Sequence, residues 1–221
     1  MILVLRPEPG AGETVQRLRG LGLEAIAAPL FTVEPVAWEA PDPAEFDALL
    51  LTSANAVRHG GDQLGQFRGL PVHAVGDATA TAARDAGFDI ASNGDAGVDR
   101  LLGSIDQQLR LLHLCGTDRR EPAAAHQRIT SVAVYQARAI DRPDLQHAKD
   151  SVALIHSPRA AARFAELIAP PDRATIAIAA ISDAAAVAAG DGWKAVEAAA
   201  QPSEEALLAL AARLCQKSAA T

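Results

Sequence analysis

Short apolar runs alternate with polar turns and helix-like segments along most of the chain. Runs of this length, each followed by a turn and an amphipathic segment, are typical of parallel strands that helices cover on both faces. We therefore expect an α/β protein. The expected strands are 2–6, 23–31, 47–53, 70–75, 110–116, 129–140, 151–157 and 174–182, and the expected helices 11–22, 77–87, 98–109 and 202–216.

One corner, in which a buried strand ends at a hydroxyl and turns into a helix, occurs twice. Leu49–Arg58 reads LLLTSANAVR, and Ala153–Ala162 reads ALIHSPRAAA, so that Ser53 matches Ser157. The next corners along the chain also match, at Gly76 and Ser182. The chain therefore carries an internal repeat of the strand-to-helix unit.

A weaker match relates the segment that begins at Ile2 to the segment that begins at Leu111. The repeated units thus follow a different order in the two halves of the chain. This order predicts two flavodoxin-like lobes with parallel sheets, one of them discontinuous: 1–35 with 141–221, and 36–140. The crossings near 31–38 and 136–143 are rich in β-branched residues and proline, and we expect them to form a two-stranded β hinge.

Composition excludes several classes of function. The 221 residues carry a net charge of −7, and the longest run of basic residues is Arg119-Arg120, which argues against nucleic-acid binding. Cys115 and Cys215 are the only cysteines, and the histidines lack ligand spacing, which argues against a disulfide framework and a metal site. Without a signal peptide or an apolar run of membrane-spanning length, the chain is expected to be soluble and cytoplasmic.

The expected corners offer groups that suit an anion. In open parallel sheets ligands bind beyond the carboxyl ends of the strands, where helix amino termini and hydroxyls are available. The alternative is that Ser and Asp at these positions only cap their own helices. Corners from two lobes that face one cleft would favour a ligand. The corners are Thr52-Ser53, Gly76-Asp77, Cys115-Gly116-Thr117, His156-Ser157 and Ser182-Asp183.

Other motifs point to less. The PGAGET segment after the first strand lacks the third glycine of a dinucleotide loop, and a flavodoxin-like nucleotide or phosphosugar protein would need a phosphate loop that is not found. No G-x-S-x-G is present. Cys115 is either a nucleophile or a small buried residue. Tyr135, the single tyrosine, is either a core aromatic or faces the cleft.

Taken in order, seven segments give the chain a resemblance to the uroporphyrinogen-III synthase family over nearly its whole length. None of them is specific alone, but they follow the family's order. They are LRPEPGAGETVQRLRGLG, FDALLLTSANAV, VHAVGDATATAARDAGF, LHLCGTDRRE, VAVYQA, LIHSPRAAARF and PSEEALLALAARL.

The resemblance implies two α/β lobes and the cyclisation of hydroxymethylbilane, a linear tetrapyrrole, to uroporphyrinogen III with inversion of ring D. It implies no cofactor and no metal, and we expect a monomer. The substrate bears eight carboxylates although the protein is acidic, so its binding must use local donors. A two-lobed anion-binding or sensor protein without turnover is the alternative.

Residue by residue, Ser53, Thr79 and Ser157 match hydroxyls that line the family's cleft, and Tyr135 matches the tyrosine that assists loss of the substrate hydroxyl. The remaining substrate-binding candidates are Arg6, Thr52, Asn55, Gly76, Gly116, Arg159 and Ser182.

The chain departs from the family pattern in two places. In its last corner Ser182, Ala184 and Ala185 replace a glycine-then-threonine pattern, which removes hydroxyls. The segment 116–130 is short for the helix that the resemblance implies, and it contains Pro122.

Overall fold

The computed structural model describes residues 1–94, 97–119 and 125–219. The segment 116–130, where the resemblance implies a helix, therefore lies partly outside the described residues. The chain forms two compact units: unit 1 comprises 1–32 and 139–221, and unit 2 comprises 33–138. The lobe limits expected from the sequence were limits of domains that fold independently, and as such they stay a prediction.

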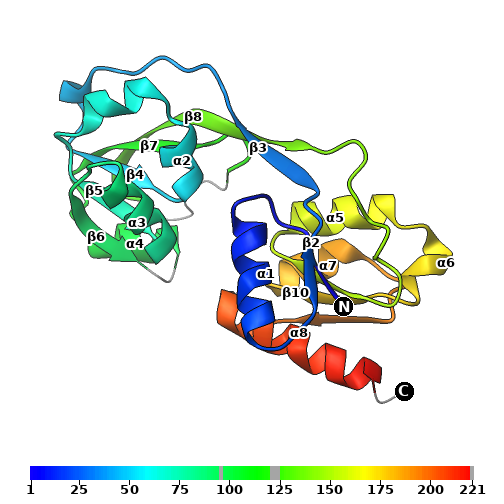
Figure 1. Ribbon diagram of the computed structural model, residues 1–221. Helices are drawn as coiled ribbons and strands as arrows, with labels where there is room; N and C mark the ends of the chain where they lie inside the picture. The colour runs from blue at the N-terminus through cyan, green and yellow to red at the C-terminus, as the bar shows by residue number, and fades with distance from the viewer. Residues whose placement is uncertain (95–96, 120–124, 220–221) are drawn as a thin grey trace. The chain divides into compact units, whose positions relative to one another are not determined.

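Unit 1 is built on a five-stranded sheet in the order β11-β10-β9-β1-β2. Figure 1 labels two of these strands, β2 and β10, together with helices of the same unit. All pairings of the sheet are parallel. Numbered along the chain within the unit, the strands follow the order 2-1-3-4-5 of flavodoxin-like folds. The strands are β1 (Ile2–Val4), β2 (Ala25–Ala27), β9 (Val152–Ile155), β10 (Ala177–Ala180) and β11 (Ala195–Ala198).

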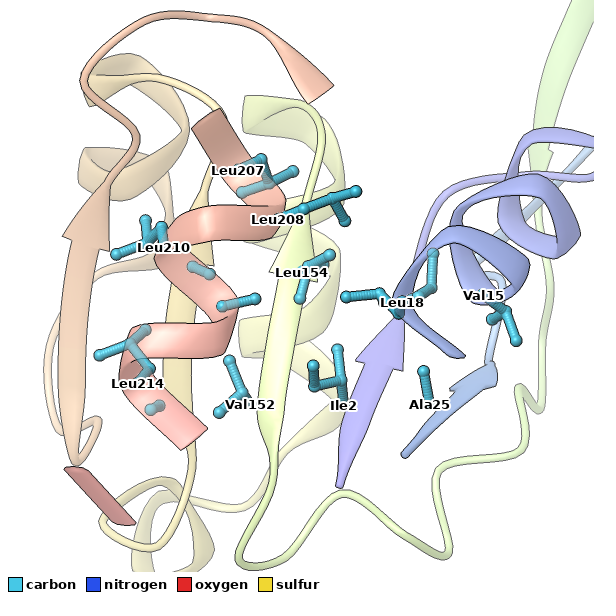
Figure 2. Packing of buried hydrophobic residues seen from close by; sticks show 14 of the residues in the cluster. Ile2, Val15, Leu18, Ala25, Val152, Leu154, Leu207, Leu208, Leu210 and Leu214 are labelled. Carbon is cyan, nitrogen blue, oxygen red and sulfur yellow. The ribbon is translucent and has the colours of Figure 1, made fainter. Parts of the chain in front are cut away.

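Helices cover both faces of this sheet, because its inner strands are apolar on both sides. Ile2 and Leu154 pack with leucines of α1 and α8 in one buried cluster (Figure 2). On the other face α5 and α7 contact β9 and β10, and α5 contributes the fully buried Phe164. The helices are α1 (Gly10–Gly20), α5 (Pro158–Leu167), α6 (Pro170–Arg173), α7 (Asp183–Ala189) and α8 (Glu204–Ala219).

Unit 2 has a six-stranded sheet in the order β3-β8-β7-β4-β5-β6. Strands β8 to β6 pair in parallel. At the edge, the Val36 amide donates to the Val134 carbonyl and the Ile140 amide donates to the Leu30 carbonyl, which is the antiparallel pattern for β3 and β8. The strands are β3 (Phe31–Pro35), β4 (Ala48–Leu51), β5 (Val72–Val75), β6 (Ile90–Gly94), β7 (Arg110–Gly116) and β8 (Arg128–Ala139).

The two crossings between the units are therefore paired strands, as the sequence predicted, and hinge movement stays a prediction. Without β3, the order β8-β7-β4-β5-β6 corresponds position by position to β2-β1-β9-β10-β11. The repeat of Ser53 and Ser157 thus equates β4 with β9, and the weaker match equates β7 with β1. The expected fold class is confirmed, including the changed order of units.

Helices also cover both faces of the sheet in unit 2. Leu49, Leu51 and Val134 belong to a buried cluster with residues of α2 and α3, and Leu50 packs with Leu101 of α4 on the other face. The helical segments are η1 (Pro43–Glu45), α2 (Ala54–His59), η2 (Asp62–Phe67), α3 (Asp77–Asp85) and α4 (Val98–Ser104).

The helix expected at 98–109 is shorter than the sequence predicted, because it ends at Ser104. Ile105 is extended, and the Asp106 carboxylate accepts from the Gln108 amide in a local turn. Gln127 Nε2 donates to the carbonyls of Leu102 and Asp106, so these carbonyls need no further helical turn. The sequence reading also missed the edge strands β6 and β11. No helix among the described residues is long and apolar enough to cross a membrane.

Candidate functional site

In each sheet the expected corners lie together at the carboxyl ends of the strands, because parallel strands end on the same side. A switch point is a place where the connections from two adjacent strands lead to opposite sides of the sheet, and flavodoxin-like sheets bind ligands there. The switch points lie between β1 and β9 in unit 1 and between β7 and β4 in unit 2. At or directly after strand ends lie the candidates Arg6, Thr52, Ser53, Gly76, Gly116, Ser157 and Ser182.

In unit 2 three candidates meet at the β7/β4 switch point. The Ser53 side chain lies close enough to the Tyr135 phenol to lower its pKa. Tyr135 is paired across β7 and β8 with Gly116, and a Cβ built on Gly116 would lie 2.8 Å from Cε2 of the Tyr135 ring. The absence of a side chain at Gly116 therefore allows the ring to lie against the end of β7.

The environment of Tyr135 keeps its phenol protonated. Burial raises the pKa of Tyr135 above its usual value, and this outweighs the effect of Ser53, which lowers it. The His59 ring lies 6.3 Å from the Tyr135 ring, centroid to centroid. The pKa of His59 is lowered by burial and by the charge of Arg58. The Tyr135 phenol therefore carries its proton at neutral pH.

Ser53 has a second role, because it is the N-cap of α2. Its backbone is extended, and its hydroxyl accepts from the Asn55 amide at 3.2 Å. The Asn55 side chain accepts from Arg58 at 3.4 Å. The capping interpretation and the ligand interpretation of this corner are therefore compatible, since one hydroxyl both caps the helix and contacts Tyr135.

Three other candidates in unit 2 have structural partners. Thr52 Oγ1 lies 3.0 Å from Nε2 of the buried His113. Thr79 is only 5% exposed, which leaves little of its hydroxyl for a ligand. Gly76 caps α3 with a φ of 84°, which favours glycine, and its amide donates to the Gly94 carbonyl.

In unit 1 a charged group occupies the β1/β9 switch point. Arg6 follows β1, and its Nη1 lies 3.1 Å from Oε2 of Glu204, the first residue of α8. His156, at the end of β9, places Nε2 3.3 Å from the same oxygen. The Thr14 hydroxyl donates to Oε1 of Glu204. Burial raises the pKa of the Glu204 carboxyl, but hydrogen bonds from His156 and Thr14 and the charge of Arg6 outweigh this and lower it to about 2.

Sequence reasoning proposed Arg6 and missed Glu204, His156 as its neighbour, and Thr14. The only signal for Glu204 was its place in the closing PSEEALL segment, where an acidic residue opens a helix after a serine. Nothing in the sequence indicated that the start of α8 lies beside the ends of β1 and β9.

The remaining candidates of unit 1 begin helices. Ser157 caps α5 and accepts from the Ala160 amide at 3.1 Å, and Ser182 caps α7 and accepts from the Ala185 amide at 3.4 Å. Arg159 is exposed, with its guanidinium carbon 4.5 Å from the centroid of the Phe31 ring. Ala185 is fully buried.

Each switch point by itself offers groups that suit a carboxylate: hydroxyls in both units and the Arg6 guanidinium in unit 1. Among residues 1–94, 97–119 and 125–219, no group of three or more His, Cys, Asp or Glu side chains could hold a metal ion.

Comparison with solved structures supports the fold. Uroporphyrinogen-III synthetase from Helicobacter pylori is 19% identical, with a TM-score of 0.66 and coverage of 96% of this chain and 98% of that chain. A mutant uroporphyrinogen III synthase from the extremely thermophilic bacterium Thermus thermophilus is 18% identical, with a TM-score of 0.52 and coverage of 98% and 99%. Among curated proteins, none matches the chain.

The sequence itself matches a family model. The model describes uroporphyrinogen-III synthase HemD, and the match extends over residues 12–209, which include both units and the first part of α8. The chain therefore belongs to the uroporphyrinogen-III synthase HemD family.

Proposed function

We infer that the chain carries out the reaction of its family, the cyclisation of hydroxymethylbilane to uroporphyrinogen III in tetrapyrrole biosynthesis. The observation that carries this inference is the family match over residues 12–209. The protein is then a lyase-type cyclase that inverts ring D as it closes the macrocycle.

The main task of the protein in this reaction is to hold the linear substrate in one conformation. Once its hydroxyl is lost, the linear substrate can close without an enzyme to the symmetric type I isomer. The protein must therefore hold the chain in the conformation that leads through a spiro intermediate to type III, and such control of geometry is a large source of catalytic effect.

Tyr135 is the proposed proton donor to the departing hydroxyl. Its support is the contact with Ser53, the space left by Gly116 and the raised pKa, which keeps the phenol protonated at neutral pH. Ser53, the neighbour of this phenol, is itself held in place as the cap of α2.

The substrate carboxylates are proposed to bind at both switch points. Arg6 and Ser157 in unit 1 and Ser53 in unit 2 supply charge and hydroxyls at strand ends. Arg159, Asn55 and Ser182 are further proposed contacts. Gly76, Thr52 and Thr79 are proposed to shape this region through the backbone contacts and buried hydrogen bonds described above.

We also propose that the protein acts as a monomer in the cytoplasm. Cys115 and Cys215 form no disulfide, which agrees with a reducing compartment. Light scattering during size-exclusion chromatography tests the monomer, and a mass near the 22.9 kDa of one chain is the expected result.

The experiment for the reaction is an isomer analysis. Purified protein is incubated with hydroxymethylbilane, and the products are oxidised to porphyrins and separated. We expect mostly type III, whereas the enzyme-free control gives type I. A type I fraction equal to that of the control would reject the cyclase, and binding of uroporphyrinogen III without turnover would then favour the anion-binding alternative.

A further inference from the structure

Three side chains from separate segments of unit 1 converge on the carboxylate of Glu204. Arg6 and His156 come from the ends of the adjacent strands β1 and β9, Thr14 from α1 and Glu204 from the start of α8. Both Glu204 oxygens are engaged: Oε1 by the Thr14 hydroxyl, and Oε2 by Arg6 at 3.1 Å and His156 at 3.3 Å. The Glu204 side chain is 21% exposed. Glu204 is therefore a fixed centre to which two nitrogen groups are attached.

Arg6 and His156 both have nitrogen atoms whose hydrogen-bonding capacity Glu204 does not use. Arg6 contacts Glu204 through Nη1, whereas a guanidinium has five N–H donors, and its side chain is 36% exposed. His156 Nδ1 is buried and has no hydrogen-bond partner among the residues that the structure describes. A buried polar atom without a partner is costly, so this nitrogen is expected to gain one when the site is filled.

Gly10 determines where the Arg6 side chain lies. A Cβ built on Gly10, the first residue of α1, would lie 2.6 Å from Nε of Arg6. The guanidinium therefore lies directly against the start of α1. Arg6 is thus held from two sides, by Glu204 and by the surface of α1.

We propose that Glu204 is a positioning residue that holds Arg6 and His156 at the β1/β9 switch point for one carboxylate of the tetrapyrrole. The inference rests on the proposed function and assigns one of the substrate carboxylates to unit 1. Arg6 directs its remaining donors to this carboxylate. His156 donates its Nε2–H to Glu204, so to act as a second donor to the substrate through Nδ1 it must carry a hydrogen on both ring nitrogens. Glu204 acts through both of them and does not touch the substrate.

A competing role for Glu204 predicts the opposite result. If Glu204 occupied Arg6 in place of the substrate, its removal would free the guanidinium and tighten binding. The geometry favours positioning, because Glu204 contacts one terminal nitrogen and leaves the rest of the guanidinium fork available. The Thr14 hydroxyl also holds the carboxylate in place independently of Arg6.

The central experiment compares Glu204→Gln with Glu205→Gln. Glu205 is the next residue of α8, is exposed, and undergoes the same loss of charge. Anaerobic titration with uroporphyrinogen III gives the affinity for product, and steady-state assays with hydroxymethylbilane give KM and kcat. For Glu204→Gln we expect product affinity to fall and KM to rise about tenfold, with a smaller change in kcat. Glu205→Gln should match the wild type.

A double-variant cycle tests whether Glu204 acts through Arg6. Arg6→Gln alone is expected to weaken product binding about tenfold, because it removes the charged donor. The double variant Arg6→Gln with Glu204→Gln should bind more weakly than Arg6→Gln alone by less than the full loss seen in Glu204→Gln, since only His156 is then left to position. Additive losses in the double variant would overturn the positioning role through Arg6.

The remaining outcomes are also decisive. Wild-type affinity in a folded Glu204→Gln variant, or tighter binding, would overturn the proposal. If this variant does not fold, Thr14→Val keeps the charge and shape while removing the hydroxyl, and about two- to fivefold weaker product binding is expected; unchanged binding would overturn the proposal. Failure of the wild type to form type III product would instead reject the proposed function.

Discussion

Gly116 and Tyr135 face each other across β7 and β8 so closely that a Cβ at position 116 would lie 2.8 Å from Cε2 and 2.9 Å from Cζ of the ring. The Tyr135 ring also packs against the buried cluster of unit 2, while its hydroxyl contacts Ser53. The end of β7 thus determines where the phenol oxygen lies.

Gly116→Ala should therefore displace Tyr135. We expect a loss of about 1–3 kcal/mol in the free energy of unfolding, because one methyl group is forced into a packed contact. We also expect kcat to fall at least as far as in Tyr135→Phe, because the phenol leaves its position. Chemical unfolding and steady-state assays measure the two effects.

Gly103→Ala is the matched control for this change. Gly103 lies in α4, and a Cβ there would meet nothing within 4 Å. The substitution should stabilise the protein by about 0.5–1 kcal/mol, since alanine favours helix, and leave kcat unchanged. Equal kcat in Gly116→Ala and Gly103→Ala would show that the contact with Tyr135 has no catalytic consequence.

Tyr135→Phe removes one oxygen and keeps the packing of the ring. General acid assistance contributes roughly 10²–10⁴-fold, but the substrate hydroxyl leaves readily without an enzyme, so we expect kcat to fall about 10–100-fold with type III still the product. Circular dichroism should be unchanged and the melting temperature shifted little. Turnover at the wild-type rate would make Tyr135 a core aromatic with its hydroxyl at the rim.

Ser157→Ala should affect both stability and binding. Loss of the cap of α5 is expected to cost about 1 kcal/mol in the free energy of unfolding. Product affinity should also fall, since Ser157 stands at the end of β9 beside His156. Asp42→Ala removes the cap of η1, which precedes β4 and therefore lies at the amino ends of the strands, away from the corners. This control should lower the free energy of unfolding without changing product affinity. Equal affinity in the two variants would restrict Ser157 to capping.

The stability of the protein should depend on pH through Glu204. Its pKa is about 2 in the folded protein against 4.5 ordinarily, so its contribution is fully present above pH 4.5 and is lost as the pH falls toward 2. At 1.36 kcal/mol per pKa unit, the advantage of the wild type over Glu204→Gln should shrink by about 2–3 kcal/mol between pH 6 and pH 2. Urea unfolding at several pH values measures this difference.

A second group titrates in the same range. Hydrogen bonds from Arg110 lower the pKa of Asp47 to about 2, and the Asp47 contribution is also lost on acidification. Because Asp47 is present in both proteins, its effect cancels in the comparison. A difference between wild type and Glu204→Gln that stays constant across this pH range would contradict the assignment to Glu204.

The parts of the fold that the sequence predicted are those with a strong local pattern. The run at 110–116 appears as β7 with those same limits, and the repeat of Ser53 and Ser157 correctly equates β4 with β9. The edge strands β6 and β11 were missed, because their exposed sides carry polar or small residues such as Asn93 and Glu197. The short α4 depends on Gln127, which is distant in sequence.

The candidate site was predictable where function and local structure use the same residue. Serines that end a strand and cap a helix are visible in sequence, and Ser53, Ser157 and Ser182 all cap helices. The group around Glu204 was not predictable, because its contact with Thr14 joins positions 190 residues apart. Periodicity carries no information about such a contact.

In the sequence, unit 2 is inserted between β2 and β9 of unit 1, and this sets an order of events during translation. Ile2 and Leu3 of β1 are fully buried in the finished protein, and they leave the ribosome before any residue of unit 2. Their neighbour β9 begins at Val152, so the nascent chain must carry an apolar strand with one side of its sheet missing until the whole of unit 2 has been made. Unit 2 meets no such delay, because its strands β4 to β8 emerge in one continuous stretch. The amino-terminal strand is therefore the segment of the growing chain most in need of a chaperone.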